Sequence, residues 1–375
     1  MNLVEALALG VGPRMAGSDA SSRAADTVAE AFRELGLETR FQEFDLVGYE
    51  ADEPELVVEG ETWPAGPCMY AHPFDGEGTV KRIGESPAPV GEGKLPNFAV
   101  VDADGREVAR LLTSPFSTGA IPFMSSHVHI TTPPTAFVSR ADSVRLLDGM
   151  RVRLKVGGRF LPGRRERNVI AELPGRSNER VLVTAHYDSV WRGPGAIDNA
   201  SGVEGVRRIG ETLRGRDLPH TVQLVAFAAE EIKLTGSRWY VDEAKLRGEL
   251  AQIAAVVNLD CIARGDKLNI LASPAELLER AKGIAGGLGL LDRYELETGP
   301  ATGGVDSHWF AEAGVPAVTI LHFPYDEYHL PAESPVLVDS KLMDDAIALA
   351  LELVESQLAH PLSRSQQHTP DVAPR

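Results

Sequence analysis

Acidic and histidine side chains recur in this sequence where short apolar runs end or loops begin. They fall in five segments: His186-Tyr187-Asp188, Asp198-Asn199, Glu230-Glu231, Asp260 and His329. Imidazole and carboxylate ligands without thiolate suit a catalytic zinc or a related divalent ion better than a structural zinc. Two ions about 3.5–4 Å apart, bridged by one aspartate, can polarise a carbonyl and acidify a shared water together. The side chains therefore predict metal-assisted hydrolysis.

Each segment has a simpler explanation when it is taken alone. A single Asp or Glu after a strand usually caps a helix or fills a turn, and a single loop His has many roles besides metal binding. The pair Glu230-Glu231 differs because it follows the apolar run 224–229, where two adjacent carboxylates need a compensating charge. A bound cation supplies that charge, so the segments together favour a metal site.

The order of apolar segments predicts the fold that positions these side chains. Short apolar runs typical of buried strands occupy residues 169–171, 181–185, 221–228, 253–259 and 317–321. Helical segments lie near residues 202–213, 275–285 and 340–358. The alternation predicts an α/β three-layer sandwich in which helices flank a mostly parallel, mixed central sheet. Ligands bind at the carboxyl ends of the strands in such sheets, and all five segments fall at that edge.

The rest of the chain predicts the domain organisation. Residues 1–45, with an amphipathic helix at about 20–35, form the N-terminal part of the catalytic domain. Residues 46–160 are rich in Gly and Pro, contain short β-like runs such as 98–101 and 152–156, and predict an inserted small β-rich domain. Residues 161–360 form the main part of the catalytic domain. Residues 361–375 are polar and predict a disordered tail.

Charge and composition restrict the partners. The 37 basic and 54 acidic residues give a net charge of −17, which argues against nucleic acid and anionic membranes as partners. No apolar stretch approaches the roughly 20 residues that a membrane span needs. No signal peptide is visible, and two cysteines far apart in sequence make a reducing, cytoplasmic compartment the default expectation. A secreted mature form stays open.

The five segments resemble the aminopeptidase Y and glutamate carboxypeptidase family, metallopeptidase family twenty-eight of the co-catalytic zinc clan. The family pattern is H-x-D, D-N, E-E, a strand-ending D and a late H, and this sequence follows it in that order. Residues 12–18, 230–237 and 306–317 also look like family segments. The resemblance implies a metallo-aminopeptidase that acts on peptides with a free N-terminus.

Carried over residue by residue, the resemblance implies two zinc ions per chain, with cobalt or manganese as alternatives. One ion would be held by His186, Asp198 and Asp260, and the other by Asp198, Glu231 and His329. Glu230 would be the general base that takes a proton from water. Asp188 would orient His186 through a hydrogen bond.

The sequence departs from the family pattern at two positions. Glu333 stands where the family often has an aspartate a few residues after the late histidine. Asp306-Ser307-His308 replaces a commoner S-D-H order. Neither change touches a proposed ligand, so both bear on how the pocket edge is braced and on specificity. Residues 46–160 carry a weaker similarity to the protease-associated domain inserted in many family members.

Three rival functions stay open. A carboxypeptidase or dipeptidase would use the same metals and need a basic cluster for the substrate carboxylate, for which Arg192, Arg238 and Arg264 are candidates. A glutaminyl cyclase-like acyl transferase would hold one metal per chain. A non-catalytic binding protein on the same fold would be expected to lack ligands. The oligomeric state is not indicated by the sequence.

Other side chains near these segments are expected to be structural. Cys261 is expected to be a small buried residue at a strand end, His308 to pack or bond locally, and His127 and His129 to lie on a strand surface. Aromatic residues close to the last histidine are expected in the core more often than in a pocket wall. They are Trp309, Phe310, His322, Phe323, Tyr325 and Tyr328.

Overall fold

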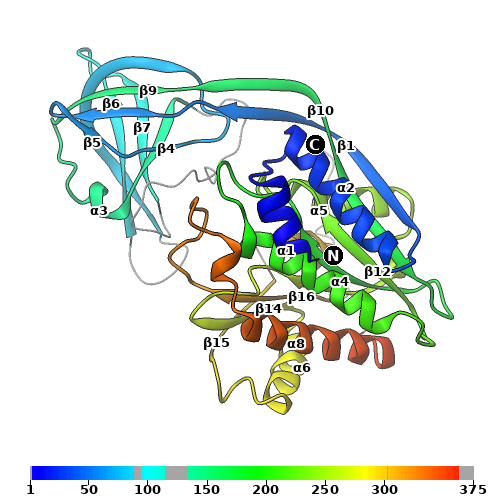
Figure 1. The fold of residues 1–375 in the computed structure, drawn as a ribbon. Coiled ribbons are helices and arrows are strands. Elements are labelled where there is room, and N and C mark those ends of the chain that lie inside the picture. The colour runs from blue at the N-terminus through cyan, green and yellow to red at the C-terminus, as the bar shows by residue number, and fades with distance from the viewer. Residues whose placement is uncertain (1, 88–93, 115–132, 302, 363–375) are drawn as a thin grey trace, which may run out of the picture.

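The computed structural model describes residues 2–87, 94–114, 133–301 and 303–362. It contains two eight-stranded sheets. Two long strands, β1 (Thr39–Ala51) and β10 (Gly158–Leu173), belong to the first sheet and pair antiparallel along most of their length. Figure 1 shows this pair running from the helix-covered sheet to the β-rich part of the molecule.

The first sheet has the strand order β1-β10-β12-β11-β13-β16-β14-β15. Its remaining strands are β11 (Arg180–His186), β12 (Thr221–Phe227), β13 (Ile253–Leu259), β14 (Lys267–Ser273), β15 (Glu295–Gly299) and β16 (Ala317–Phe323). The central strands β12, β11, β13 and β16 are parallel. Strand β10 runs antiparallel to both of its neighbours, β1 and β12, whereas β14 is antiparallel to β16 and parallel to β15. The expected mixed α/β architecture is therefore confirmed.

Helices cover both faces of this sheet. Successive residues of β11 point to opposite faces, because Val181 and Val183 join one core cluster and Leu182 joins another. The first face is covered by α2 (Asp19–Glu34), α4 (Gly202–Leu213), α6 (Ala275–Gly287) and α8 (Ser340–Ala359). The second face is covered by α5 (Thr235–Leu246) and α7 (Ser307–Glu312). Strands buried on both faces explain the continuous apolar runs in the sequence.

The predicted helices agree with the structure to within two residues at each end. Helix α2 begins after Ser18, whose side chain accepts the backbone N–H of Ser21, and it buries Ala24, Val28 and Phe32. Shorter helical pieces lie at Leu3–Glu5 (α1), Ala6–Val11, Arg140–Ser143 (α3), Ala196–Ser201, Leu250–Gln252 and Pro335–Leu337. Every helix in the described ranges is too short or too polar to cross a bilayer.

The β-rich part is folded around its own apolar cluster, which includes Leu56, Val100, Leu111 and Leu154. Its strands are β2 (Glu55–Val58), β3 (Glu61–Trp63), β4 (Gly66–Pro67), β5 (Phe74–Pro87), β6 (Lys94–Val101), β7 (Glu107–Thr113), β8 (Thr135–Val138) and β9 (Arg151–Val156). Their order is β3-β2-β9-β5-β6-β7-β8-β4. The expected strands 98–101 and 152–156 lie in β6 and β9.

The expected insertion limits, residues 46 and 160, fall inside β1 and β10. The expected strand 169–171 is only the buried end of β10. Residues 158–168 of that strand are mostly half-buried or exposed and rich in arginine, so they carry no apolar run that the sequence could reveal. His127, His129 and the tail from residue 363 lie outside the described residues.

Candidate metal centre

The five predicted segments meet at one edge of the first sheet. His186 ends β11, Glu230 and Glu231 follow β12, Asp260 follows β13, and His329 lies in the loop after β16. Asp198 lies in the helical turn Ala196–Ser201 that precedes α4. Strands β11, β12, β13 and β16 are parallel, so their carboxyl ends deliver these side chains to the same place.

Asp198 lies between the two histidines. One of its carboxylate oxygens, Oδ1, is 3.1 Å from Nε2 of His186, and the other, Oδ2, is 3.1 Å from Nε2 of His329. A second acid lies near each ring. Oδ1 of Asp260 is 3.5 Å from Nε2 of His186, and Oε2 of Glu231 is 3.4 Å from Nε2 of His329. His186 with Asp260 forms one group and His329 with Glu231 forms the other, and Asp198 belongs to both.

Donor atoms in this region are close enough to hold metal ions. Three sets each have their donor atoms within 4.8 Å of one another: His186, Glu230 and Asp260; Asp198, Glu231 and His329; and Asp198, Asp260 and Cys261. Glu230 belongs to the first set, with Oε2 3.9 Å from Nε2 of His186 and 11% of its side chain exposed. The geometry thus brings together all the predicted ligands and the predicted base.

The burial of these side chains, and the lack of hydrogen bonds to three of their carboxylate oxygens, suit the binding of divalent cations. The side chains of His186, Asp198, Glu231, Asp260 and His329 are all buried. Atoms Oδ1 of Asp198, Oδ1 of Asp260 and Oε1 of Glu231 accept no hydrogen bond from any residue that the structure describes. Buried carboxylate oxygens are normally hydrogen-bonded, paired or bound to a metal.

The electrostatics of the acids lead to the same conclusion. Burial raises the pKa of Glu231 and Asp260, and repulsion from Asp198 raises it further, against the opposing effect of the histidines. For His329 burial acts in the opposite direction and lowers the pKa of the ring. The neighbouring Glu231 and Asp198 more than offset this effect and raise the pKa of His329 to about 10. Negative charge is in excess here, and bound divalent cations would compensate it.

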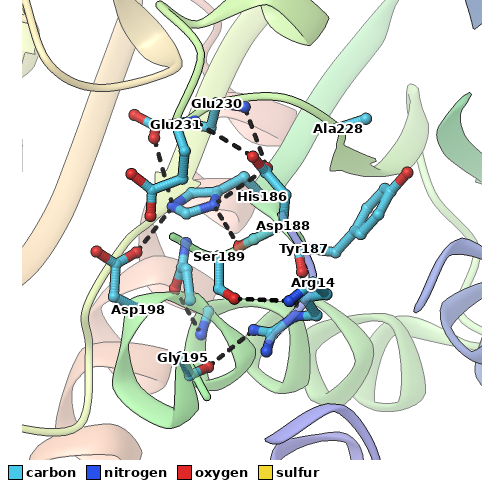
Figure 2. A network of polar contacts seen from close by, with 12 residues as sticks. Arg14, His186, Tyr187, Asp188, Ser189, Gly195, Asp198, Ala228, Glu230 and Glu231 are labelled. Carbon is cyan, nitrogen blue, oxygen red and sulfur yellow. Dashed lines mark hydrogen bonds and ion pairs between the residues drawn. The ribbon is translucent and has the colours of Figure 1, made fainter. Parts of the chain in front are cut away.

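Asp188 contacts both His186 and the glutamate pair. Its Oδ1 is 3.6 Å from Nδ1 of His186, and its backbone oxygen is 3.3 Å from the same nitrogen. Its carboxylate accepts the backbone N–H groups of Glu230 and Glu231 at 3.1 and 3.3 Å. Figure 2 shows Asp188 between the imidazole and these two residues. The carboxylate therefore ties the end of β11 to the loop after β12.

Arg14 lies behind the site, a position that the sequence did not predict. Its guanidinium is completely buried and donates to the backbone oxygens of Tyr187, Pro194 and Gly195. Figure 2 shows Arg14 reaching the chain at Gly195, just before Asp198. Burial lowers the pKa of Arg14 to about 10, although Asp188 and Glu333 oppose the shift. The residue holds the loop between His186 and Asp198 and keeps a positive charge near the acids.

Glu333, which was expected to bear on how the pocket edge is braced, lies in the interior beside the proposed ligands. Its side chain is 1% exposed. Oε1 accepts the backbone N–H groups of Ile197 and Asp198 at 3.0 and 2.6 Å, and Oε2 accepts that of His329 at 3.2 Å. The departure from the family pattern signalled this residue, but its backbone partners could not be deduced from side-chain types.

Three of the six aromatic residues near His329 are buried, namely Phe310, His322 and Tyr325, and the other three are half-buried. Phe310 is fully buried against Phe227 and Tyr240, with ring centroids 6.2 and 5.7 Å away. Tyr328 is half-buried, and its ring stacks on that of His329 at 3.7 Å. Cys261 is buried, as expected, with its Sγ 3.7 Å from the hydroxyl of Tyr325.

Comparisons with known proteins agree with the location of the site. Residues 168–354 match the model of peptidase family M28. Aminopeptidase YwaD of Bacillus subtilis is 26% identical over 287 residues, which are 69% of this chain and 60% of that protein. Leucine aminopeptidase 2 of Arthroderma otae is 35% identical over 135 residues, which are 34% of this chain and 27% of that protein. The chain thus covers less than two thirds of either relative.

Solved structures share the fold. A zinc aminopeptidase from Bacillus subtilis superposes with a TM-score of 0.71 at 20% identity, over 95% of this chain and 93% of that chain. A peptidase M28 precursor from Shewanella amazonensis superposes with a TM-score of 0.76 at 19% identity, over 100% of this chain and 95% of that chain. A glutaminyl cyclase from Porphyromonas gingivalis gives 0.56 at 16% identity, over 95% and 96%.

Proposed function

Because this chain belongs to peptidase family M28 through residues 168–354, we propose that it is a metallo-aminopeptidase that removes the N-terminal residue of peptides. The observation that carries the proposal is the position of Asp198, whose two oxygens each lie 3.1 Å from a different histidine. The curated relatives named above are aminopeptidases, which supports the same activity.

The donor atoms suit two zinc ions, with cobalt or manganese as alternatives. One ion would be held by His186, Asp198 and Asp260, and the other by Asp198, Glu231 and His329. When bound, such ions polarise the scissile carbonyl, lower the pKa of a shared water and stabilise the developing oxyanion. The buried carboxylate oxygens that accept no hydrogen bond from the described residues support this assignment.

Glu230 acts as the general base in this proposal. It takes a proton from the attacking water and later delivers that proton to the leaving amine. Burial raises the pKa of its carboxyl, and Glu231 and Asp306 raise it further, although His186 opposes them. A raised pKa suits a carboxylate that must accept and return a proton near neutral pH. Asp188 keeps Glu230 in position by accepting its backbone N–H.

The carboxypeptidase alternative receives less support from the arginines. Arg192 pairs with Glu53, Arg238 lies 3.6 Å from Asp242, and Arg264 makes two hydrogen bonds of 3.0 and 2.9 Å to Glu327. Each candidate for holding a substrate carboxylate thus already has an acidic partner. A glutaminyl cyclase-like function would be favoured by one bound ion per chain in place of two.

The β-rich part is proposed to be a protease-associated-like insertion that shapes access to the site. It has its own apolar core, and two tyrosines attach it to the strand that leads into it. The hydroxyl of Tyr70 donates to the backbone oxygen of Val47, and that of Tyr49 donates to the backbone oxygen of Ala71.

Cys68 and Cys261 are free buried thiols, which is compatible with the proposed cytoplasmic location.

A panel of matched peptides tests the activity. The purified full chain, loaded with zinc, is given dipeptides with a free or acetylated N-terminus, each with a free or amidated C-terminus. Aminopeptidase action requires cleavage whenever the amino group is free, whether or not the carboxyl end is blocked. Cleavage that depends on a free carboxylate and tolerates acetylation would support the carboxypeptidase alternative instead.

A further inference from the structure

Glu333 is a buried carboxylate that the proposed reaction uses neither as a ligand nor as a base. It follows His329 by four residues and precedes the short helical turn Pro335–Leu337. Its carboxylate accepts three backbone N–H groups, from Ile197, Asp198 and His329. Three such bonds hold the carboxyl group in one orientation.

The three bonds connect two separate ligand segments. One oxygen binds the loop that carries Asp198, and the other binds the backbone of His329 itself. Asp198 and His329 are two of the three residues that would hold the second ion, and Glu231 is the third. A single carboxyl group therefore bonds to both of the backbone segments from which Asp198 and His329 extend.

The segment that carries His329 needs such support because its local backbone is unfavourable. His329 has a left-handed conformation with φ of +61°. Left-handed backbone is costly for a residue other than glycine unless surrounding contacts hold it. The bond from the N–H of His329 to Glu333 is one contact of this kind.

Asp188 performs the corresponding task elsewhere in the site. It accepts the backbone N–H groups of Glu230 and Glu231, and it lies against His186. The two carboxylates thus support different segments. Asp188 connects His186 with the glutamate pair, whereas Glu333 connects Asp198 with His329.

We propose that Glu333 is a positioning residue that fixes Asp198 relative to His329 and thereby sets the affinity for the ion that these two residues share with Glu231. The ion held by His186 and Asp260 depends on Glu333 only through Asp198, so it is affected less. The inference rests on the proposed two-metal function.

Glu333→Gln is the most direct variant because it keeps the size and shape of the side chain. The amide has one oxygen and one NH₂ group, so it can accept hydrogen bonds on only one side. Its NH₂ group must face either the N–H groups of Ile197 and Asp198 or the N–H of His329. Glu333→Asp keeps both acceptors but is one methylene shorter, so it cannot reach both segments together.

The test is a calorimetric titration of the metal-free full chain with zinc alone. Wild type is expected to bind two ions. In Glu333→Gln one of the two affinities should fall by about 10–100-fold, the usual effect of losing a group that orients a ligand, while the other stays close to wild type. Adding excess zinc should restore a large part of kcat, which a general loss of folding would not allow.

Glu204→Gln serves as the matched control. Glu204 is also a buried carboxylate that accepts a backbone N–H, that of Leu3 at 3.1 Å, and it pairs with Arg207. This variant should bind both ions as wild type does. If Glu333→Gln misfolds, as judged by near-ultraviolet circular dichroism, Glu333→Asp is titrated instead and should show the same selective weakening.

The outcomes separate the inference from the proposed function. Equal weakening of both ions, or unchanged binding of both, in a folded Glu333 variant overturns the positioning role. Wild type that binds fewer than two zinc ions contradicts the two-metal proposal itself, whatever the variants do.

Discussion

His186 and Asp198 approach each other to 3.1 Å between Nε2 and Oδ1, although one ends a strand and the other lies in a turn before a helix. The second oxygen of Asp198 has the same distance to His329. The shared aspartate therefore joins two halves of the site, and the consequences of changing it differ from those of changing the base.

Glu230→Gln should retain bound metal and lose turnover. The amide cannot accept a proton from water, and general base catalysis contributes about 10²–10⁴-fold to a rate. Steady-state hydrolysis of an aminoacyl amide and elemental analysis of the same sample measure both quantities. Near-normal activity in a variant with full metal content would show that another group is the base.

Asp198→Ala should lose affinity for both ions and not only for one. Asp198 is the only residue assigned to both proposed ions, so its removal leaves each with one histidine and one carboxylate. Metal content after dialysis is the measurement, with Glu230→Gln as the control that keeps its metal. Retention of two tightly bound ions in Asp198→Ala would contradict its bridging role.

Arg14→Lys should destabilise the protein and slow catalysis together. Lysine keeps the positive charge, but its ammonium cannot bond to Tyr187, Pro194 and Gly195 in the geometry of the guanidinium fork. Leaving buried backbone oxygens without donors should lower the free energy of unfolding by about 2–4 kcal/mol.

Arg106→Lys is the control for this change, because Arg106 pairs with Asp104 at the surface with 77% of its side chain exposed. It should change the free energy of unfolding by less than about 0.5 kcal/mol. Urea denaturation of both variants provides the comparison. If Arg14→Lys and Arg106→Lys had the same free energy of unfolding, Arg14 would not support the site through its hydrogen bonds.

His322 should make the folded state sensitive to acid. The ring is fully buried, against Tyr294, and burial lowers its pKa to about 4. Below pH 6.5 the unfolded chain takes up a proton that the folded chain does not, so stability falls as the pH drops from about 6.5 towards 4. The loss should be on the order of 3 kcal/mol at pH 4.

His322→Leu removes this titration without removing the acids that also titrate at low pH. The difference in free energy of unfolding between wild type and variant should therefore change between pH 7 and pH 4, in favour of the variant. Denaturant titrations at several pH values measure it. Parallel stability curves across that range would refute the assignment.

Much of the fold and the convergence of the site could be predicted because buried parallel strands leave a direct trace in the sequence. The runs before His186, Glu230 and Asp260 are apolar because both faces of β11, β12 and β13 are covered. Parallel strands end at one edge, so the residues that follow them meet. That inference needs only the order of the segments.

The supporting residues could not be predicted in the same way. Arg14 and Glu333 bind backbone groups of distant segments, and every residue except proline has the same backbone donor and acceptor. The sequence therefore holds no complementary side chain that identifies their partners. Residues 158–168 of β10 were not predicted as a strand for a related reason, because their charged side chains resemble those of a loop.

The measurement that tests the central claim most directly is a crystal structure of the zinc-loaded protein with an anomalous difference map at the zinc edge. Two peaks are expected, one on each side of the Asp198 carboxylate, with His186 and Asp260 at one and Glu231 and His329 at the other. A map with no peak between His186 and Asp198, in crystals of a protein that retains its zinc, would contradict it.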